Sequence, residues 1–348
     1  MTQPVAITAV GMVTGVGLNA AASCAAIRCA IDGFEETRFM DDGGEWIMGC
    51  SVPLEEPWRG KTKLVKMAAA AIQECLEQTP QLKTEQTPLL LCLPETERPG
   101  RVFTDDNALF LKLQQEMGLE FHAKSRVIAM GRVSFGVALQ RARQLIHDKT
   151  ADHVIIAGTD SLLVGATLAE FMEREYVLTS QNSDGFIPGE AGSAVVVEPV
   201  YQKPEPQLIC YGLGFGTEAA HVDSEEPLRA DGLTTAIKQS LSDAGIAMHD
   251  LDFRITDVSG KQYYFKEAAL ALGRILRVRK EEFDIWHPAD CVGEVGAAIG
   301  GTMFGVIKSA CEKGYSKGHE VLFHVGNDDG RRVALVMTWR AIDGGDHG

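Results

Sequence analysis

The feature that most constrains the fold is an unbroken run of small and β-branched residues at 193–197, inside the stretch SDGFIPGEAGSAVVVE at 183–198. A run of this kind bounded by glycine is typical of a strand that is buried on both faces. Such a strand lies in the middle of a sheet covered by helices. The sequence therefore predicts a large α/β domain, for which 348 residues are ample length.

Helical and extended patterns alternate along both halves of the chain. Asn19 is a predicted N-cap, and residues 95–110 are predicted to form a surface excursion. Expected strands lie at 5–12, 46–52, 89–93, 153–157, 207–216, 320–325 and 333–339. Expected helices lie at 20–30, 63–76, 108–117, 138–146 and 233–246. A glycine-rich turn followed by a further helix is expected within 286–311.

The order of motifs before the 193–197 strand carries a resemblance. An amphipathic helix leads to an Ala-Asp pair at 151–152, an apolar strand, Gly158 and then DGFIPGEAG. This order, together with the N-terminal VAITAVGMVTGVG, resembles the β-ketoacyl synthase branch of the thiolase-fold superfamily. The resemblance implies a five-layer αβαβα fold of two similar halves, 1–200 and 201–348, that dimerises through the strand beside the nucleophile turn.

The resemblance also implies three catalytic positions, a cysteine on a strand-to-helix turn and two histidines. Counting back from the Ala-Asp pair puts the nucleophile position at Arg132, or at Ser134 with a two-residue shift. The flanking family motifs put Asp257 and Glu294 at the histidine positions. A pocket is expected around these positions, lined by the motif residues Gly189, Glu190, Gly192, Gly293 and Gly296.

These substitutions predict the loss of condensation chemistry. No cysteine lies between Cys92 and Cys210, so the thiol nucleophile is missing. Asp and Glu side chains have unperturbed pKa values of about 3.9 and 4.3, and as anions they would oppose a developing oxyanion. We expect Arg132 to pair with Asp257 or Glu294 and to fill the former pocket as an ion-paired plug.

Two alternatives for the site stay open on the sequence. In one interpretation, Ser134 is a hydroxyl nucleophile with Asp257 or Glu294 as its base. In the other, Ser134 is an N-cap residue at the start of a helix. The two acids either bind a divalent cation or a cationic ligand, or lie solvated in a remodelled cleft. We predict no resident metal and no cofactor.

Other motifs favour structural roles. Residues 212–216, GLGFG, resemble part of a dinucleotide loop but are not followed by a suitable acid-capped βαβ unit. His221 and His287 are isolated and lack the spacing of metal ligands. The 8 cysteines occur singly, which favours buried, reduced thiols and a cytoplasmic location.

The net charge of −15 argues against nucleic acid and anionic membranes as partners. The first functional hypothesis is a non-condensing accessory or adaptor protein, which by resemblance is associated with type VI secretion effectors. The alternatives are an acyltransferase or thioesterase that uses Ser134, and a chain-length-factor-like partner of an active synthase. The expected partners are a second subunit in a homodimer or heterodimer, and a synthase, carrier protein or secreted effector.

Overall fold

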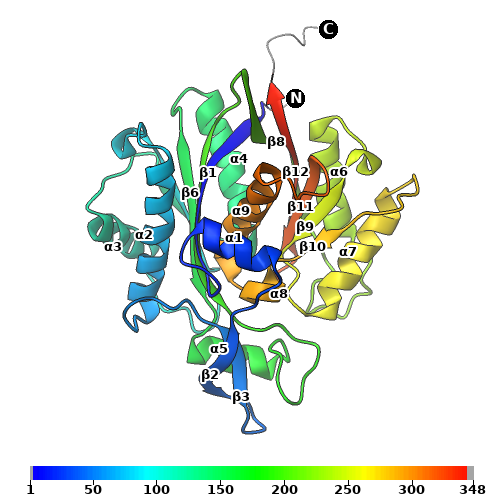
Figure 1. Cartoon of the computed structure of the whole chain (residues 1–348). Coiled ribbons are helices and arrows are strands. Elements are labelled where there is room, and N and C mark those ends of the chain that lie inside the picture. Colours follow the sequence, from blue (N-terminus) through cyan, green and yellow to red (C-terminus); the bar gives the residue numbers. More distant parts are fainter. Residues whose placement is uncertain (1–2, 343–348) are drawn as a thin grey trace.

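The computed structural model describes residues 3–342 and contains a ten-stranded sheet that bends around two central helices (Figure 1). The strands lie in the order β10-β9-β11-β12-β8-β1-β7-β6-β4-β5. Their bounds are Val5–Val13 (β1), Leu89–Leu93 (β4), Arg126–Ala129 (β5), Val154–Ser161 (β6), Glu190–Pro199 (β7), Lys203–Thr217 (β8), Phe253–Thr256 (β9), Ile285–Trp286 (β10), Glu320–Gly326 (β11) and Arg331–Ile342 (β12).

Each half of the chain contributes five of these strands in the same relative order. When the strands of each half are numbered along the chain, the second strand lies between the third and the fourth and is parallel to both. The fourth pairs with the fifth and the fifth with the first, both antiparallel. An antiparallel pairing of β1 with β8, from Val5–Cys210 to Ile7–Leu208, joins the two sets. The strand order is therefore that of an internal duplication.

The helices complete five layers. Two helices cover the outer face of each half of the sheet, and two lie between the halves (Figure 1). The outer helices are Gly60–Gln78 (α2) and Asp106–Met117 (α3) on the first half and Asp231–Ala244 (α6) and Gln262–Ile275 (α7) on the second, and the central ones are Ser134–His147 (α4) and Ile299–Glu312 (α9). Separate apolar clusters fill the spaces between these layers. The predicted αβαβα thiolase-like fold is confirmed.

The remaining elements are short. A two-stranded sheet and one helix project from one end of the molecule (Figure 1). These projecting elements are Phe34–Met40 (β2), Trp46–Cys50 (β3) and Gly165–Glu173 (α5). The other short helices are Ala20–Arg28 (α1) and Ala289–Val292 (α8), and the single turns of 3-10 helix are Thr84–Gln86 (η1), Gly131–Val133 (η2), Met248–Asp250 (η3) and Gly296–Ala298 (η4). The sequence analysis did not predict β2.

The strand used to infer the fold class lies where it was expected. β7 pairs with β1 on one side and β6 on the other, and its residues 190–198 are all buried. Asn19 caps α1, where its side-chain oxygen accepts a hydrogen bond from the backbone N–H of Ala22 at 2.8 Å. That helix ends at Arg28 instead of residue 30, because Ala30 adopts a positive φ of 52° that no right-handed helix contains.

The cysteines are free thiols, and all except Cys29 are buried. Burial raises the pKa of Cys24 to about 11 and that of Cys50 to about 12. A thiol with so high a pKa is a poor nucleophile at neutral pH. The expectation of buried thiols without disulfide partners is confirmed within the described residues.

The packing of the two central helices generates a stability prediction. A Cβ atom added at Gly300 in α9 would lie 2.4 Å from Cβ of Phe135 in α4. We expect Gly300→Ala to lower the free energy of unfolding by about 1–3 kcal/mol, as overpacked cores do. The measurement is chemical denaturation.

Gly273 in α7 is the matched control, because an added Cβ there meets nothing within 4 Å. We expect Gly273→Ala to stabilise the protein slightly, by up to about 1 kcal/mol, since alanine is the better helix former. Equal stability of the Gly300→Ala and wild-type proteins would contradict the close approach of α4 and α9.

Candidate functional site

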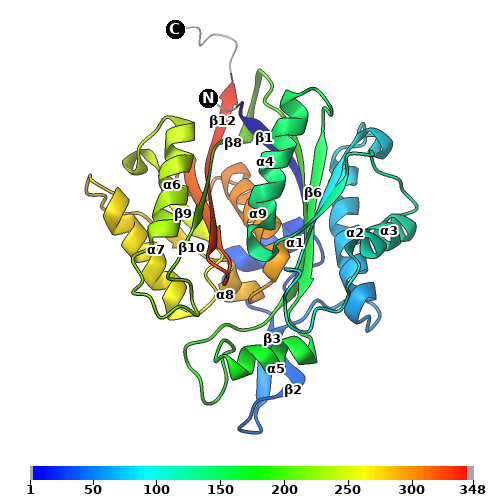
Figure 2. The same cartoon turned by 180° about the vertical axis from the view of Figure 1, so that it is seen from behind.

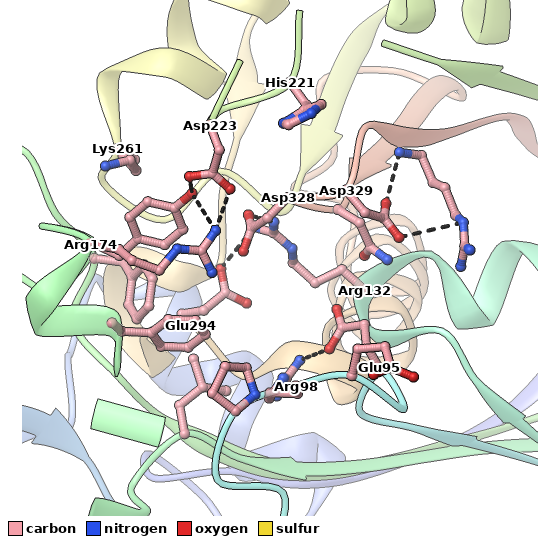
Figure 3. A pocket seen from close by; sticks show the side chains of 18 of the residues that line it. Glu95, Arg98, Arg132, Arg174, His221, Asp223, Lys261, Glu294, Asp328 and Asp329 are labelled. Carbon is pink, nitrogen blue, oxygen red and sulfur yellow. Dashed lines mark hydrogen bonds and ion pairs between the residues drawn. The ribbon is translucent and has the colours of Figure 1, made fainter. Parts of the chain in front are cut away.

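Arg132 lies in the turn that connects β5 to α4. Gly131 precedes it with a positive φ of 58°, a backbone conformation that favours glycine, and lies close to the carboxylate of Glu95. The Arg132 side chain is 9% exposed and extends into a cavity of about 510 Å³ (Figure 3). A buried guanidinium therefore occupies the strand-to-helix turn.

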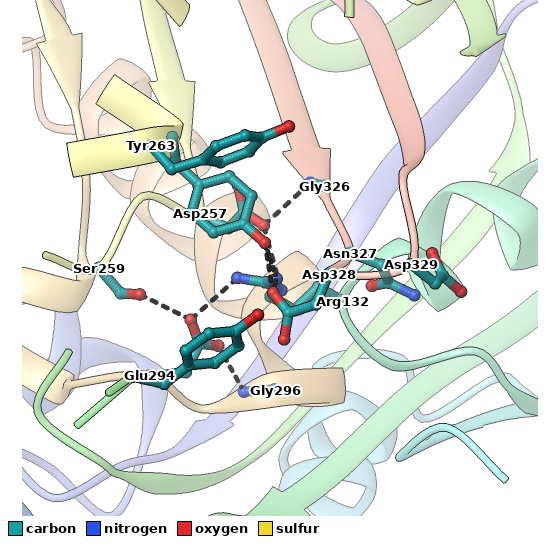
Figure 4. Close-up of polar contacts among 12 residues, drawn as sticks. Arg132, Asp257, Ser259, Tyr263, Glu294, Gly296, Gly326, Asn327, Asp328 and Asp329 are labelled. Atoms are coloured by element: carbon teal, nitrogen blue, oxygen red, sulfur yellow. Dashed lines mark hydrogen bonds and ion pairs between the residues drawn. The ribbon is translucent and has the colours of Figure 1, made fainter. Parts of the chain in front are cut away.

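Three carboxylates from separate loops surround this guanidinium (Figure 4). Nη2 of Arg132 lies 2.5 Å from Asp328, Nη1 lies 3.3 Å from Glu294, and Nε lies 3.7 Å from Asp257. Asp257 follows β9, Glu294 follows α8, and Asp328 lies in the turn between β11 and β12. The ion pair predicted between Arg132 and Asp257 or Glu294 is confirmed for both acids.

Each predicted acid is also held by neutral donors. Ser259 donates its hydroxyl to Oε2 of Glu294 at 2.7 Å, and the backbone N–H of Gly296 donates to Oε1 at 3.0 Å. The backbone N–H of Gly326 donates to Oδ2 of Asp257 at 3.0 Å. These bonds keep both carboxylates oriented toward Arg132.

Tyr264 closes the cluster from α7. Its hydroxyl donates a hydrogen bond to Asp328 and accepts one from Nη2 of Arg132 at 2.9 Å. The guanidinium carbon also lies 4.8 Å from the centre of the Tyr264 ring, within the range of a cation–π contact. Sequence analysis missed Tyr264 and Asp328. The only available signal for Asp328 was its place between the strands predicted at 320–325 and 333–339.

The acids of the cluster differ in their protonation. Burial raises the pKa of Asp257 to about 6, against the opposing effect of Arg132. Burial also disfavours the anion of Asp328, but the Arg132 guanidinium and the Tyr264 hydroxyl outweigh it and hold the Asp328 pKa below its usual value. Burial opposes the charge of Arg132, but the surrounding anionic groups raise its pKa well above its usual value. Arg132 is therefore permanently cationic.

Comparisons with known proteins agree on one fold. No family model matches the chain. Two curated proteins align with parts of it: a 3-oxoacyl-[acyl-carrier-protein] synthase 2 of Coxiella burnetii, 30% identical over 128 residues, and a putative mitochondrial 3-oxoacyl-[acyl-carrier-protein] synthase of Schizosaccharomyces pombe, 23% identical over 167 residues. The alignments span 32% and 43% of this chain but only 30% and 39% of those proteins.

The solved structures match over nearly the whole chain. A ketosynthase in complex with its chain length factor from Xenorhabdus doucetiae covers 97% of this chain, with 98% of its own chain aligned, at 15% identity and a TM-score of 0.74. The ishigamide ketosynthase/chain length factor aligns over 97% and 99% at 14% identity and a TM-score of 0.80. The chain has the ketosynthase form of the thiolase fold.

Within this ketosynthase-type fold, Ser134 does not face the cavity. It is fully buried, its hydroxyl donates to the backbone oxygen of Ile128 at 3.1 Å, and its Oγ accepts from the N–H of Met130 at the same distance. Its hydroxyl is bonded to neither Asp257 nor Glu294, so the pair expected for a nucleophile and its base is not formed in this structure. Ser134 is also not the N-cap, because it is the first residue of α4 and follows the cap position.

None of the motif residues expected to line the pocket lines this cavity. Glu190 is buried and accepts hydrogen bonds from the N–H of Val52 at 2.9 Å and from Ser161 at 2.8 Å. Gly189 donates its N–H to the backbone oxygen of Glu294 at 2.9 Å and so helps to place that acid. Close approach of neighbouring atoms requires glycine at Gly189, Gly192, Gly293 and Gly296, none of which lines the cavity.

A second buried ion pair forms the cavity wall. Arg98 lies 2.7 Å from Asp160, which also accepts the backbone N–H of Ala297 at 2.8 Å. Arg98 is 8% exposed and pairs with Glu95 as well. The loop predicted as a surface excursion does carry exposed residues at 96–97, but the Arg98 side chain turns inward and neutralises Asp160 near the end of β6.

The other motif readings lead to no site. Residues 212–216 belong to β8 and form no loop. His221 lines the cavity, whereas His287 pairs with Asp290 at 2.8 Å. Within residues 3–342, no group of three or more His, Cys, Asp or Glu side chains is arranged to hold a metal ion. Across the same residues, no helix has the length and apolar character needed to span a membrane.

The Arg132 cluster generates a stability prediction. We expect Arg132→Ala to lower the free energy of unfolding by about 3–5 kcal/mol, because the variant leaves the buried carboxylates of Asp257 and Glu294 without their cation. Arg331→Ala is the control, since the Arg331–Asp329 pair is about half exposed and is worth less than about 1 kcal/mol. Equal effects of the two substitutions in chemical denaturation would refute the role of Arg132 in stability.

The pKa of Asp257 generates a pH prediction. The folded protein binds this proton more tightly than the unfolded chain, so the contribution of Asp257 to stability falls as the pH rises from about 4 to about 6. The free energy of unfolding of Asp257→Asn, relative to wild type, should therefore rise over this range by on the order of 3 kcal/mol and then level off.

Asp328→Asn is the control of opposite sign. Because the pKa of Asp328 is lowered, the stability of this variant relative to wild type should fall as the pH rises through the normal range of an aspartate. Denaturation curves at a series of pH values test both variants. Parallel pH dependence of the two variants would contradict the assignment.

Proposed function

We propose that the chain is a non-condensing ketosynthase-like protein that acts as the partner of another protein. The observation that carries the proposal is the buried Arg132 guanidinium at the strand-to-helix turn, paired with Asp257, Glu294 and Asp328. The described lining of the adjoining cavity contains no cysteine. By resemblance to the condensing enzymes, this is where a thiolate and two donors to the oxyanion are required.

The charges of the cluster disfavour condensation. A guanidinium is always protonated and cannot attack a thioester. The three carboxylates around Arg132 outnumber the single cation, and Asp257 adds its negative charge above about pH 6. An enolate or oxyanion formed in this place would be repelled, whereas catalysis needs donors that stabilise the developing anion.

The nature of the solved structures supports a subunit role. Two of the most similar ones are a ketosynthase with its chain length factor, and a third is a ketosynthase in complex with an acyl-carrier protein. By analogy, we propose that this chain pairs with an active synthase, as a chain length factor does. β5 offers an edge for this pairing, because it pairs with β4 on one side and is the last strand of the sheet.

The alternatives have less support. An acyltransferase or thioesterase that uses Ser134 would need a hydroxyl that reaches the cavity, and this one is bonded to the backbone of the preceding turn. An adaptor role beside type VI secretion effectors and a cytoplasmic location stay predictions from resemblance and composition. The cavity and the cluster bear on neither of them.

Intact-mass spectrometry after incubation with acyl-CoA, malonyl-CoA and the corresponding acyl-carrier proteins tests the proposal. We expect no covalent acyl adduct, no decarboxylation and no thioester hydrolysis above background, because neither a thiol nor the Ser134 hydroxyl lines the cavity. Ser134→Ala is the control and should behave as wild type. A stable mass increase that disappears in Ser134→Ala would instead establish the acyltransferase or thioesterase alternative.

A further inference from the structure

A second cavity of about 540 Å³ lies between β2 and the start of α2. Figure 2 shows β2 and β3 at the end of the molecule where α5 also lies. Residues 35–39 of β2 line the cavity, together with residues within 51–64 that reach the first turn of α2 and residues within 161–165 between β6 and α5. This cavity shares no lining residue with the one beside Arg132, so the two are separate sites.

The open edge of β2 runs along this second cavity. Among the described residues, β2 pairs with β3 alone, in regular register at residues 34–36 and again at Met40. Successive side chains of a strand point to opposite faces, so a cavity that touches the consecutive residues 35–39 lies against the edge of the strand. An open edge of this kind can pair with an extended peptide.

The inner wall of the cavity is polar and electrically balanced. Glu190 is 3% exposed and pairs with the ammonium group of Lys63. Glu190 also accepts hydrogen bonds from the hydroxyls of Ser51 at 3.1 Å and Ser161 at 2.8 Å. Lys63 donates to Ser51 at 3.3 Å, and an ammonium group has three N–H donors, so a ligand can accept from the remaining one. An uncharged peptide group, whose carbonyl oxygen accepts and whose N–H donates, matches this wall.

The remaining walls of the cavity are largely apolar. Val52 and Leu64 are buried, and Leu54, Val102 and Leu163 are half-buried. Cavities of a few hundred Å³ with such walls hold a ligand through apolar burial, while a few polar groups fix its orientation. An aliphatic side chain of a bound peptide therefore has room to be buried here.

The hairpin formed by β2 and β3 exposes further apolar surface. Met40 and Trp46 are cross-strand neighbours, and they are 48% and 47% exposed. Phe39, the residue before Met40, lines the cavity. The apolar pair thus extends the binding surface beyond the cavity, which favours a segment of a macromolecule over a small molecule.

The charge of the hairpin indicates the chemistry of this segment. Residues 32–58 contain eight acids and one base, Arg38. Three of the acids are exposed and line the cavity, namely Glu35, Glu36 and Glu56. Arg38 and Arg59 are exposed bases of the same lining, so acids are in excess at its rim. An excess of acids favours a ligand with basic side chains.

We propose that the edge of β2 and the adjoining cavity bind an extended peptide segment of the partner protein, in which an apolar residue is flanked by basic residues. The apolar side chain enters the cavity, and the peptide backbone meets Lys63 and the edge of β2. The inference rests on the proposed role as the partner of another protein. It adds a second contact surface and the chemistry of the segment that this surface binds.

Selection from a phage-displayed library of random heptapeptides tests the inference without the natural partner. The full chain is the bait. We expect the enriched sequences to carry an apolar residue with Lys or Arg on both sides. A synthetic peptide of an enriched sequence should bind the chain in solution, as measured by fluorescence anisotropy. Added salt should weaken this binding, because exposed charges are screened.

Three variants locate the binding energy. Glu35→Lys with Glu36→Lys reverses charge at the rim and should weaken binding of the selected peptide by at least about tenfold. Val164→Trp places a larger side chain in the lining and should also weaken binding. Glu281→Lys with Glu282→Lys is the matched control, because it makes the same change at two adjacent exposed acids outside the cavity, and it should bind as wild type does. Far-UV circular dichroism and thermal melts confirm that each variant is folded.

Hydrogen–deuterium exchange locates the peptide directly. We expect the backbone amides of residues 34–39 to exchange more slowly when the selected peptide is bound, because an added strand protects the N–H groups of an open edge. A peptide held elsewhere by charge alone would leave these amides unprotected.

Several outcomes would overturn the inference. They are a selection without enriched peptides, equal binding by the two charge-reversal variants, and protection that leaves out residues 34–39. A wild-type dimer that the reversal at Glu35 and Glu36 disrupts would assign the surface to a second copy of the chain instead. None of these outcomes bears on the proposed lack of condensation or on pairing at β5, because those are measured as covalent acylation and as binding of a synthase.

Discussion

The buried guanidinium of Arg132 is the interaction on which the site depends. It comes from the turn before α4 in the first half of the chain, and its three carboxylates come from loops of the second half. A charge taken out of water is costly unless it is paired and hydrogen-bonded, so each of these loops is constrained by the same side chain. The cluster therefore links the two halves of the chain.

The surrounding structure is consistent with a site that satisfies itself. Ser259, Gly296 and Gly326 donate to the acids, and Tyr264 bridges Arg132 and Asp328. Behind the cluster, Arg332 is almost fully buried and donates through Nε to both carboxylate oxygens of Glu267, at 2.8 and 2.9 Å. The charged groups of the cluster and the neighbouring Arg332–Glu267 pair are thus each matched by partners within the protein.

Sequence reasoning found part of this site for identifiable reasons. Arg132, Asp257 and Glu294 were located by counting from motifs that resemble those of the β-ketoacyl synthases, so their positions followed from the resemblance. Asp328 and Tyr264 have no such signal. A turn rich in Asn, Asp and Gly predicts a turn in any protein, and an aromatic residue on an amphipathic helix normally predicts a core position.

By itself, the sequence determined the fold class. The apolar run at 193–197 can be buried only between strands, and the helices on either side of it repeat at 3.6-residue spacing. Only the tertiary structure decided which groups meet. Whether Arg132 or Ser134 faces the cavity depends on the direction of the backbone in one turn after Gly131, and the fourth member of the cluster comes from a loop almost 200 residues away. Local patterns do not encode such contacts, because burial, not sequence distance, brings these charges together.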